Sequence, residues 1–177
     1  MEHRPQVGET FRIDVPTANQ PLFPARPGVS DTVVAVDIGT TTVVVLVVDG
    51  VSGELLSRAG GFNDQIRFGD NVLTRIAAGG DPLVRREMQA AVVATISGLL
   101  ERACQRAGRE PSRISGGAIA GNTTMLHLLV GEDPSSLGVA PFRPGFVAGR
   151  RIVWGELGAD GPLAAATPLH LLPGISG

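Results

Sequence analysis

The sequence predicts an α/β fold in which three strands joined by short turns come first, and a long helix, a fourth strand and a second helix follow. Two runs rich in β-branched residues, 32–37 and 42–48, lie close together and are separated by a tight Gly-Thr turn, as in antiparallel strands. From residue 69 onward the apolar residues recur at helical spacing instead. A doubly wound dinucleotide fold would alternate strand and helix, and its Gly-x-Gly-x-x-Gly motif occurs nowhere in this chain.

The early strands are bounded by turn residues. The run 32–37 ends in an acid, and the run 42–48 is almost continuous valine. Asp49 and Gly50 then begin a turn, after which residues 54–62 are expected to form the third strand. Three neighbouring strands with such short connections predict an antiparallel meander.

The helical part has defined start and stop residues. Helical spacing first covers 69–78, and Asp81 followed by Pro82 then suits the start of a long helix that Gly108 ends. A fourth strand is expected over 114–120. Asn122 is expected to cap a second helix, which ends before Gly131. The remaining expected elements are a Pro- and Gly-rich loop and two short strands, at 134–149, 151–154 and 169–172. This order is typical of a ribonuclease-H-like half-domain.

Residues 1–30 differ from the rest of the chain. Five prolines punctuate them, and only the short alternating run 11–15 is strand-like. We interpret them as an extended linker or the tail of a preceding domain, with a boundary near Ser30 and one folded unit over 31–177.

The charged residues exclude several kinds of chemistry. All 15 basic residues are Arg and none is Lys, whereas a Walker-type P-loop and a Schiff-base enzyme both need Lys. The net charge of −2 favours neither nucleic acid nor an anionic membrane as a partner.

Cys104 is the one cysteine, which excludes a disulfide framework and any all-cysteine zinc or iron–sulfur site within this chain. Its amphipathic surroundings predict a buried, inert thiol. The polar N-terminus has no apolar core of a signal peptide, and the longest apolar stretch, 33–48, is too short and too polar to span a bilayer. We therefore expect a cytoplasmic protein.

The turn after the first strand has the chemistry of a phosphate site. Asp37 is delivered at a strand end, Gly39 permits close approach of the backbone, and Thr40, Thr41 and Thr42 supply hydroxyls and N–H groups. A carboxylate beside phosphates needs a metal between them, so Asp37 is expected to hold hydrated Mg²⁺ through water. The alternatives are a plain hairpin turn with a solvated Asp, and the Asp-x-Gly-Thr motif of aspartic proteases, which a following valine strand does not favour.

A second candidate lies between the fourth strand and the helix after it. Gly121, Asn122 and Thr123 stand where a helix N-terminus can attract an anion. The alternative is an Asn helix cap with no ligand. Gly116 and Gly121 have P-loop spacing, but Asn-Thr stands where Lys-Ser/Thr is required, so we reject a P-loop.

Four other features are less specific. Arg67 could meet an acidic partner or a phosphate, or be a plain surface residue. His127 on an apolar helix face is expected in the core rather than in catalysis. His170 stands isolated among leucines and receives no role, and the rigid loop 141–144 is only a candidate interaction surface.

Taken together, the motifs resemble those of the reductive activators of corrinoid proteins, in order and at that family's spacing from about Thr32 to the C-terminus. The motifs are Val36-Asp37-Ile38-Gly39-Thr40-Thr41-Thr42, Asn63-x-Gln65, Gly69-Asp70-Asn71-Val72-x-x-Arg75-Ile76, Ala120-Gly121-Asn122-Thr123-Thr124-Met125-x-His127-Leu128-Leu129 and Pro134-Ser135-Ser136-Leu137-Gly138-Val139-Ala140-Pro141-Phe142-Arg143-Pro144. The wider actin, heat-shock protein 70 and sugar kinase superfamily shares only the Asp-Ile-Gly-Thr turn.

The resemblance implies an actin-like module that uses ATP and Mg²⁺ to help return an oxidised corrinoid methyltransfer protein to the cob(I) state. Asp37, Gly39, Thr40, Thr41 and Thr42 then correspond to the first phosphate motif. Gly121, Asn122 and Thr123 correspond to the loop after the fourth strand. The corrinoid protein of a methyltransferase system is the implied partner.

Two departures from that pattern predict either a fragment or a chain whose missing parts a partner supplies, and residues 1–30 favour a fragment. The iron–sulfur cluster of such proteins has no ligands here, so it is expected only in a missing upstream domain. The chain also ends at 172–177, where a second phosphate loop would begin. Only one half of an actin-like ATP site is then present, and this ATPase half-module is not expected to be active alone. An exposed apolar half-cleft could also let two copies form a homodimer.

Three other functions stay open at this stage. A small-molecule kinase on the same fold would need a carboxylate base, whereas the fourth-strand loop offers Asn122. A dehydratase activator would need cluster cysteines at a dimer interface. A non-catalytic interaction domain would keep the fold without binding nucleotide.

Overall fold

The early strands form the predicted meander. The computed structural model describes residues 32–158 and 161–174. Within them β1 (Thr32–Ile38) pairs antiparallel with β2 (Thr42–Asp49), which pairs antiparallel with β3 (Leu55–Phe62). The predicted linker and its strand-like run at 11–15 lie outside the described residues.

The other half of the sheet joins segments that are distant in sequence. β4 (Gly116–Gly121) runs parallel to β1, and β6 (Pro168–Leu171) runs parallel to β4. β5 (Arg150–Val153) pairs antiparallel with β6 and forms the edge, so the strand order is β3-β2-β1-β4-β6-β5. The two late strands were predicted, but their positions in the sheet were not.

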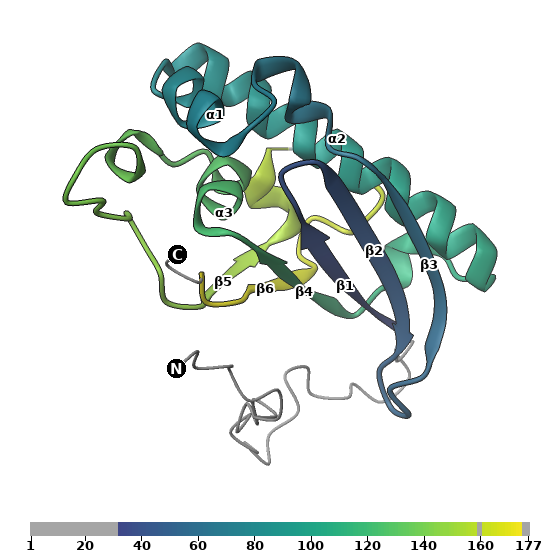
Figure 1. Ribbon diagram of the computed structural model, residues 1–177. Helices are drawn as coiled ribbons and strands as arrows, with labels where there is room; N and C mark the ends of the chain where they lie inside the picture. Colours follow the sequence, from purple (N-terminus) through teal and green to yellow (C-terminus); the bar gives the residue numbers. More distant parts are fainter. Residues whose placement is uncertain (1–31, 159–160, 175–177) are drawn as a thin grey trace, which may run out of the picture.

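The helices lie together on one side of this sheet (Figure 1). They are α1 (Val72–Gly79), α2 (Pro82–Ala107) and α3 (Thr123–Val130). Short 3₁₀ helices cover Asp64–Phe68, Pro111–Arg113, Ser135–Leu137 and Trp154–Leu157. Strands first, then helix–strand–helix, is the predicted order.

The predicted boundaries of α2 and α3 are confirmed by their caps, whereas α1 begins at Val72, after the Asn71 cap, and not at residue 69. The Asp81 side chain accepts from the N–H groups of Leu83 and Val84 at the start of α2. Gly108 and Gly131 end α2 and α3 with φ of 63° and 73°, a conformation that costs other residues free energy. Both helices therefore end at a glycine because glycine adopts this positive φ at little cost in free energy.

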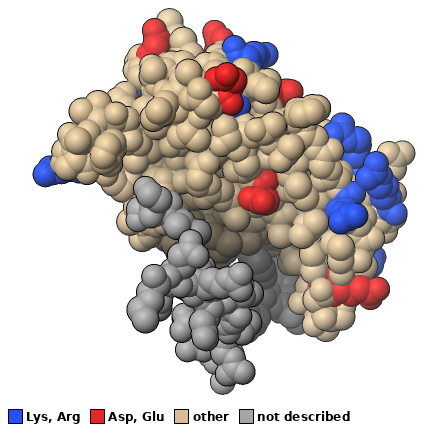
Figure 2. All heavy atoms as spheres, in the orientation of Figure 1, with Lys and Arg blue, Asp and Glu red and all other residues tan. Residues whose placement is uncertain are grey.

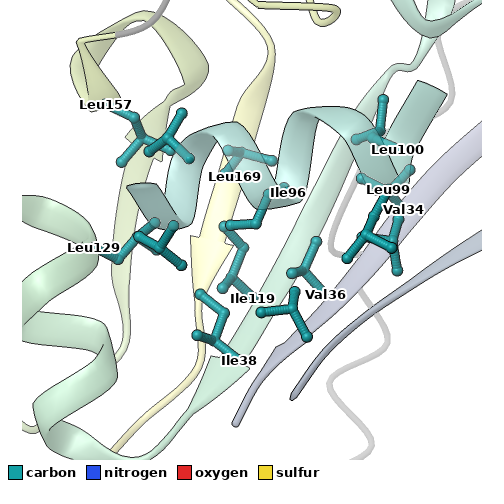
Figure 3. Packing of buried hydrophobic residues seen from close by; sticks show 14 of the residues in the cluster. Val34, Val36, Ile38, Ile96, Leu99, Leu100, Ile119, Leu129, Leu157 and Leu169 are labelled. Carbon is teal, nitrogen blue, oxygen red and sulfur yellow. The ribbon is translucent and has the colours of Figure 1, made fainter. Parts of the chain in front are cut away.

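The core lies between the sheet and α2. Alternate residues of β1 and β2 are fully or nearly fully buried, because successive side chains of a strand point to opposite faces. They pack against α2 residues such as Ile96, Leu99 and Leu100 (Figure 3). The same alternation turns Asp37 away from this core, and its side chain is exposed.

The charged surface is mixed. In the view of Figure 2, acidic and basic side chains lie mainly along the upper and right-hand parts of the molecule, whereas the middle and left of this face carry few charges. None of the described helices is long and apolar enough to cross a bilayer.

Cys104 is expected to resist alkylation in the folded chain. Its thiol is fully buried, and burial, assisted by Glu110, raises its pKa to about 11. At pH 8 only about one thiol in a thousand is then the reactive thiolate. Mass spectrometry after brief iodoacetamide treatment should show no modification of the native chain and full modification in guanidinium. Rapid stoichiometric labelling of the native chain would contradict this assignment.

Candidate functional site

The two candidate loops meet because β1 and β4 are parallel neighbours. Their register pairs Asp37 with Ala120 and Ile38 with Gly121. Both strands therefore end at the same edge of the sheet, and each continues into one of the loops. There the Asn122 Nδ2 donates to the Thr40 Oγ1 over 3.3 Å. The two motifs, about 80 residues apart in sequence, thus form one candidate site and contact each other directly.

The first loop is a closed turn. The Gly39 N–H donates to the Thr42 carbonyl over 2.8 Å, and a Cβ on Gly39 would lie only 2.8 Å from that oxygen. Thr41 and Thr42 are exposed, while Thr40 is partly covered. The turn therefore requires glycine for its shape and presents threonines toward solvent, as an anion-binding turn would.

The second loop opens α3 in the predicted way. The Asn122 Oδ1 accepts the Met125 N–H over 2.9 Å and thus caps the helix. A Cβ on Gly121 would lie 3.1 Å from the Ile38 carbonyl, so Gly121 lets the two strand ends approach. Thr123 is partly exposed, and Gly174, just after β6, lies against it. The Asn122 oxygen thus caps the helix while its nitrogen bonds the first loop, and its role in nucleotide binding stays a prediction.

Asn63 holds the first loop in place from the buried side, a role that the sequence did not reveal. This fully buried side chain donates from Nδ2 to the Gly39 carbonyl over 2.9 Å, and its backbone N–H donates to the Thr41 carbonyl over 2.8 Å. Its Oδ1 accepts from the Gln65 N–H, while the Gln65 Nε2 donates to the Met88 carbonyl in α2. The turn is therefore anchored to the long helix. The only available signal was the Asn-x-Gln motif after the third strand.

The acidic group at this edge is Asp37. Among the described residues no group of three or more His, Cys, Asp and Glu side chains could hold a metal. A single exposed carboxylate fits hydrated Mg²⁺, which keeps several waters and takes few protein ligands. It does not fit the closed cage of a structural metal.

The less specific candidates lie elsewhere. Arg67 places its guanidinium 4.8 Å from the centre of the Phe68 ring, which favours the surface interpretation. His127 is fully buried, with Nδ1 2.7 Å from the Thr123 carbonyl and Nε2 accepting from the Gly145 N–H, so the core assignment is confirmed. Burial and the neighbouring Arg151 lower the pKa of His170. Phe142 is 62% exposed, and its suggested role in interaction stays a prediction.

Comparison with known proteins agrees with this geometry. A sequence model described as the RACo middle region matches residues 32–177. The chain belongs to this family. A corrinoid activation enzyme of Eubacterium limosum, RamQ, is 37% identical over 110 residues, which are 62% of this chain and 18% of that protein. A solved structure described as a reductive activator for a corrinoid, iron–sulfur protein superposes with a TM-score of 0.75 at 34% identity, over 80% of this chain and 22% of the other.

These matches confirm the predicted family resemblance and the fold class. The chain spans about a fifth of the length of the two relatives it matches. What those whole proteins do therefore extends to this chain only as a proposal.

Proposed function

We propose that this chain forms one side of an ATP site in an ATP-dependent reductive activator of corrinoid proteins. The observation that carries the proposal is the Thr40–Asn122 contact, which joins two glycine-containing loops at the ends of adjacent parallel strands. Crevices outside the carboxyl ends of such strands are common ligand sites in α/β sheets. The names of the two relatives supply the corrinoid part of the proposal.

Each residue of the candidate site has a defined role in this proposal. The N–H groups and hydroxyls of Thr40, Thr41 and Thr42 would hold the phosphates, and Gly39 would let the backbone approach them. Gly121, Asn122 and Thr123 would face the nucleotide from the start of α3. Asp37 would hold Mg²⁺ through water, and the metal would neutralise phosphate charge.

The remaining parts of the activity would come from outside the described residues. We infer that a second half-domain closes over the nucleotide, and that closure changes affinity for the corrinoid protein. The iron–sulfur cluster of such an activator would be carried by a separate domain. A cytoplasmic location follows from the same proposal.

The test is a reactivation assay with the complete gene product that contains this chain. A corrinoid methyltransfer protein is oxidised to the cob(II) state, and its return to cob(I) is followed by visible absorbance with a reductant present. We expect recovery only when Mg-ATP is added. Recovery at the same rate without ATP would contradict the proposal.

Asp37→Asn gives the matching residue-level result. We expect a roughly five- to tenfold loss of Mg-ATP affinity by calorimetry, because the amide cannot supply the charge that a hydrated cation needs. Asp49→Asn is the control, since Asp49 lies at the opposite end of β2 and its Oδ1 only accepts turn N–H groups. Equal Mg-ATP affinities of the wild-type protein, Asp37→Asn and Asp49→Asn would show that Asp37 takes no part in nucleotide binding.

A further inference from the structure

Arg75 is a buried cation without an acidic partner in the described part of the chain. Its side chain is fully buried on α1, and no carboxylate lies within salt-bridge distance of it among the described residues. The Nε donates to the Gly69 carbonyl over 2.9 Å, and Nη1 lies 3.6 Å from the Met125 Sδ. Within residues 32–158 and 161–174, the Arg75 Nη2 has no hydrogen-bond partner.

Such an arrangement is costly for a fold. A charge removed from water loses its hydration, and one carbonyl and one thioether replace little of it. Burial accordingly lowers the pKa of Arg75, and Asp70 opposes this only in part. An arginine nevertheless remains protonated at neutral pH. The site therefore holds a nearly uncompensated positive charge.

This charge lies beneath the junction of the two loops. The Met125 Sδ that contacts Arg75 is also 3.8 Å from the Asn63 Nδ2, and that same nitrogen donates to the Gly39 carbonyl. On its backbone side, the Met125 N–H is capped by Asn122. Arg75 is thus linked to the second loop through Met125, and to the first loop through Met125 and then Asn63.

A buried charge acts over a longer range than an exposed one, because the protein interior and the absence of salt screen it less. An anion bound at the two loops would add to the partial compensation that Asp70 provides within the described residues.

We propose that Arg75 is a buried counter-charge for a polyphosphate anion, such as the triphosphate of a nucleotide, held at the Gly39–Thr42 turn and the start of α3. It strengthens binding through the field of its guanidinium and touches no ligand atom. The inference rests on the proposed function, and it assigns a role to the Asp-Asn-Val-x-x-Arg motif. The competing explanation is a structural one, in which Arg75 only fastens α1 to the Gly69 carbonyl and α3.

Three substitutions in the complete gene product separate these explanations. Arg75→Met keeps length and apolar contact but removes the charge, and Arg75→Lys keeps the charge. Arg86→Met makes the same change in net charge at an exposed position of α2. For each variant, calorimetry measures the affinity for Mg-ATP and for tripolyphosphate at two salt concentrations, and thermal unfolding measures stability without ligand.

For Arg75→Met we expect a roughly tenfold loss of affinity for both anions and a weaker dependence of binding on salt. Its melting temperature without ligand should equal or exceed that of the unchanged protein. Arg75→Lys should retain affinity within about threefold, and Arg86→Met should match the unchanged protein.

Unaltered affinity of Arg75→Met would overturn the inference while leaving the proposed function in place. Equal losses of stability and affinity in Arg75→Met and Arg75→Lys would also overturn it, in favour of the structural role. Absence of any Mg-ATP or tripolyphosphate binding by the unchanged protein would overturn the proposed function and this inference together.

Discussion

Gly117→Ala is expected to destabilise the fold by about 1–3 kcal/mol. Gly117 lies in β4 between β1 and β6, where an added Cβ would be 2.6 Å from a Val34 methyl and 2.9 Å from the Val34 carbonyl. Backbone atoms cannot yield as a flexible side chain can, so the strands must shift apart. Urea unfolding followed by circular dichroism measures the difference.

Gly60→Ala provides the matched control for this substitution. Gly60 lies in β3 of the same sheet, but a Cβ there would meet its nearest neighbours at 3.8 Å, which is ordinary contact. We expect the control to be neutral or slightly more stable, because alanine restricts the unfolded chain. Equal stability of the two variants would mean that β1 and β4 tolerate separation.

Gly39→Ala is expected to lower the affinity for Mg-ATP roughly ten- to hundredfold. The added Cβ would lie 2.8 Å from the Thr42 carbonyl, which is also the acceptor of the Gly39 N–H. Opening this turn moves Thr40 away from Asn122 and displaces the carbonyl that Asn63 holds. Calorimetry on the complete gene product tests this expectation.

Thermal unfolding separates a local effect at Gly39 from a general one. Because the turn lies at the edge of the sheet and Thr41 and Thr42 are exposed, we expect Gly39→Ala to be less destabilising than Gly117→Ala. The Gly60→Ala variant should bind like the unchanged protein. Unchanged binding by Gly39→Ala would mean that the turn does not hold phosphate.

The two proposals make different use of this edge of the sheet. The loops themselves would make the direct contacts with phosphate, and Asn63 fixes the first loop to α2 through Gln65. Arg75 would add a positive charge from the protein interior beneath the two loops. A substitution that lowers both affinity and stability therefore indicates a residue that holds the loops in place. A substitution that lowers affinity alone indicates a residue that contributes charge to the site.

The sequence by itself determined the elements and the candidate loops. Helix boundaries were predictable because Asp81, Gly108, Asn122 and Gly131 act through their own backbone neighbourhoods. Strands β1 and β2 were predictable from local β-branched runs joined by a short turn. The burial of Cys104 and His127 was predictable from the apolar periodicity around them. The chemistry of the Gly39–Thr42 turn is likewise a local property.

The tertiary structure alone decided which loops meet and what lies beneath them. The pairing of β1 with β4, and the placement of β6 between β4 and β5, depend on contacts between residues far apart in sequence, which periodicity does not encode. For the same reason, the sequence marked Asn63 and Arg75 only as members of two motifs and assigned neither of them a role. Both residues are buried beneath the turn, and no acid lies within salt-bridge distance of Arg75 among the described residues. These facts follow only from the packing of α1 against α2 and α3 and of α2 and α3 against the sheet.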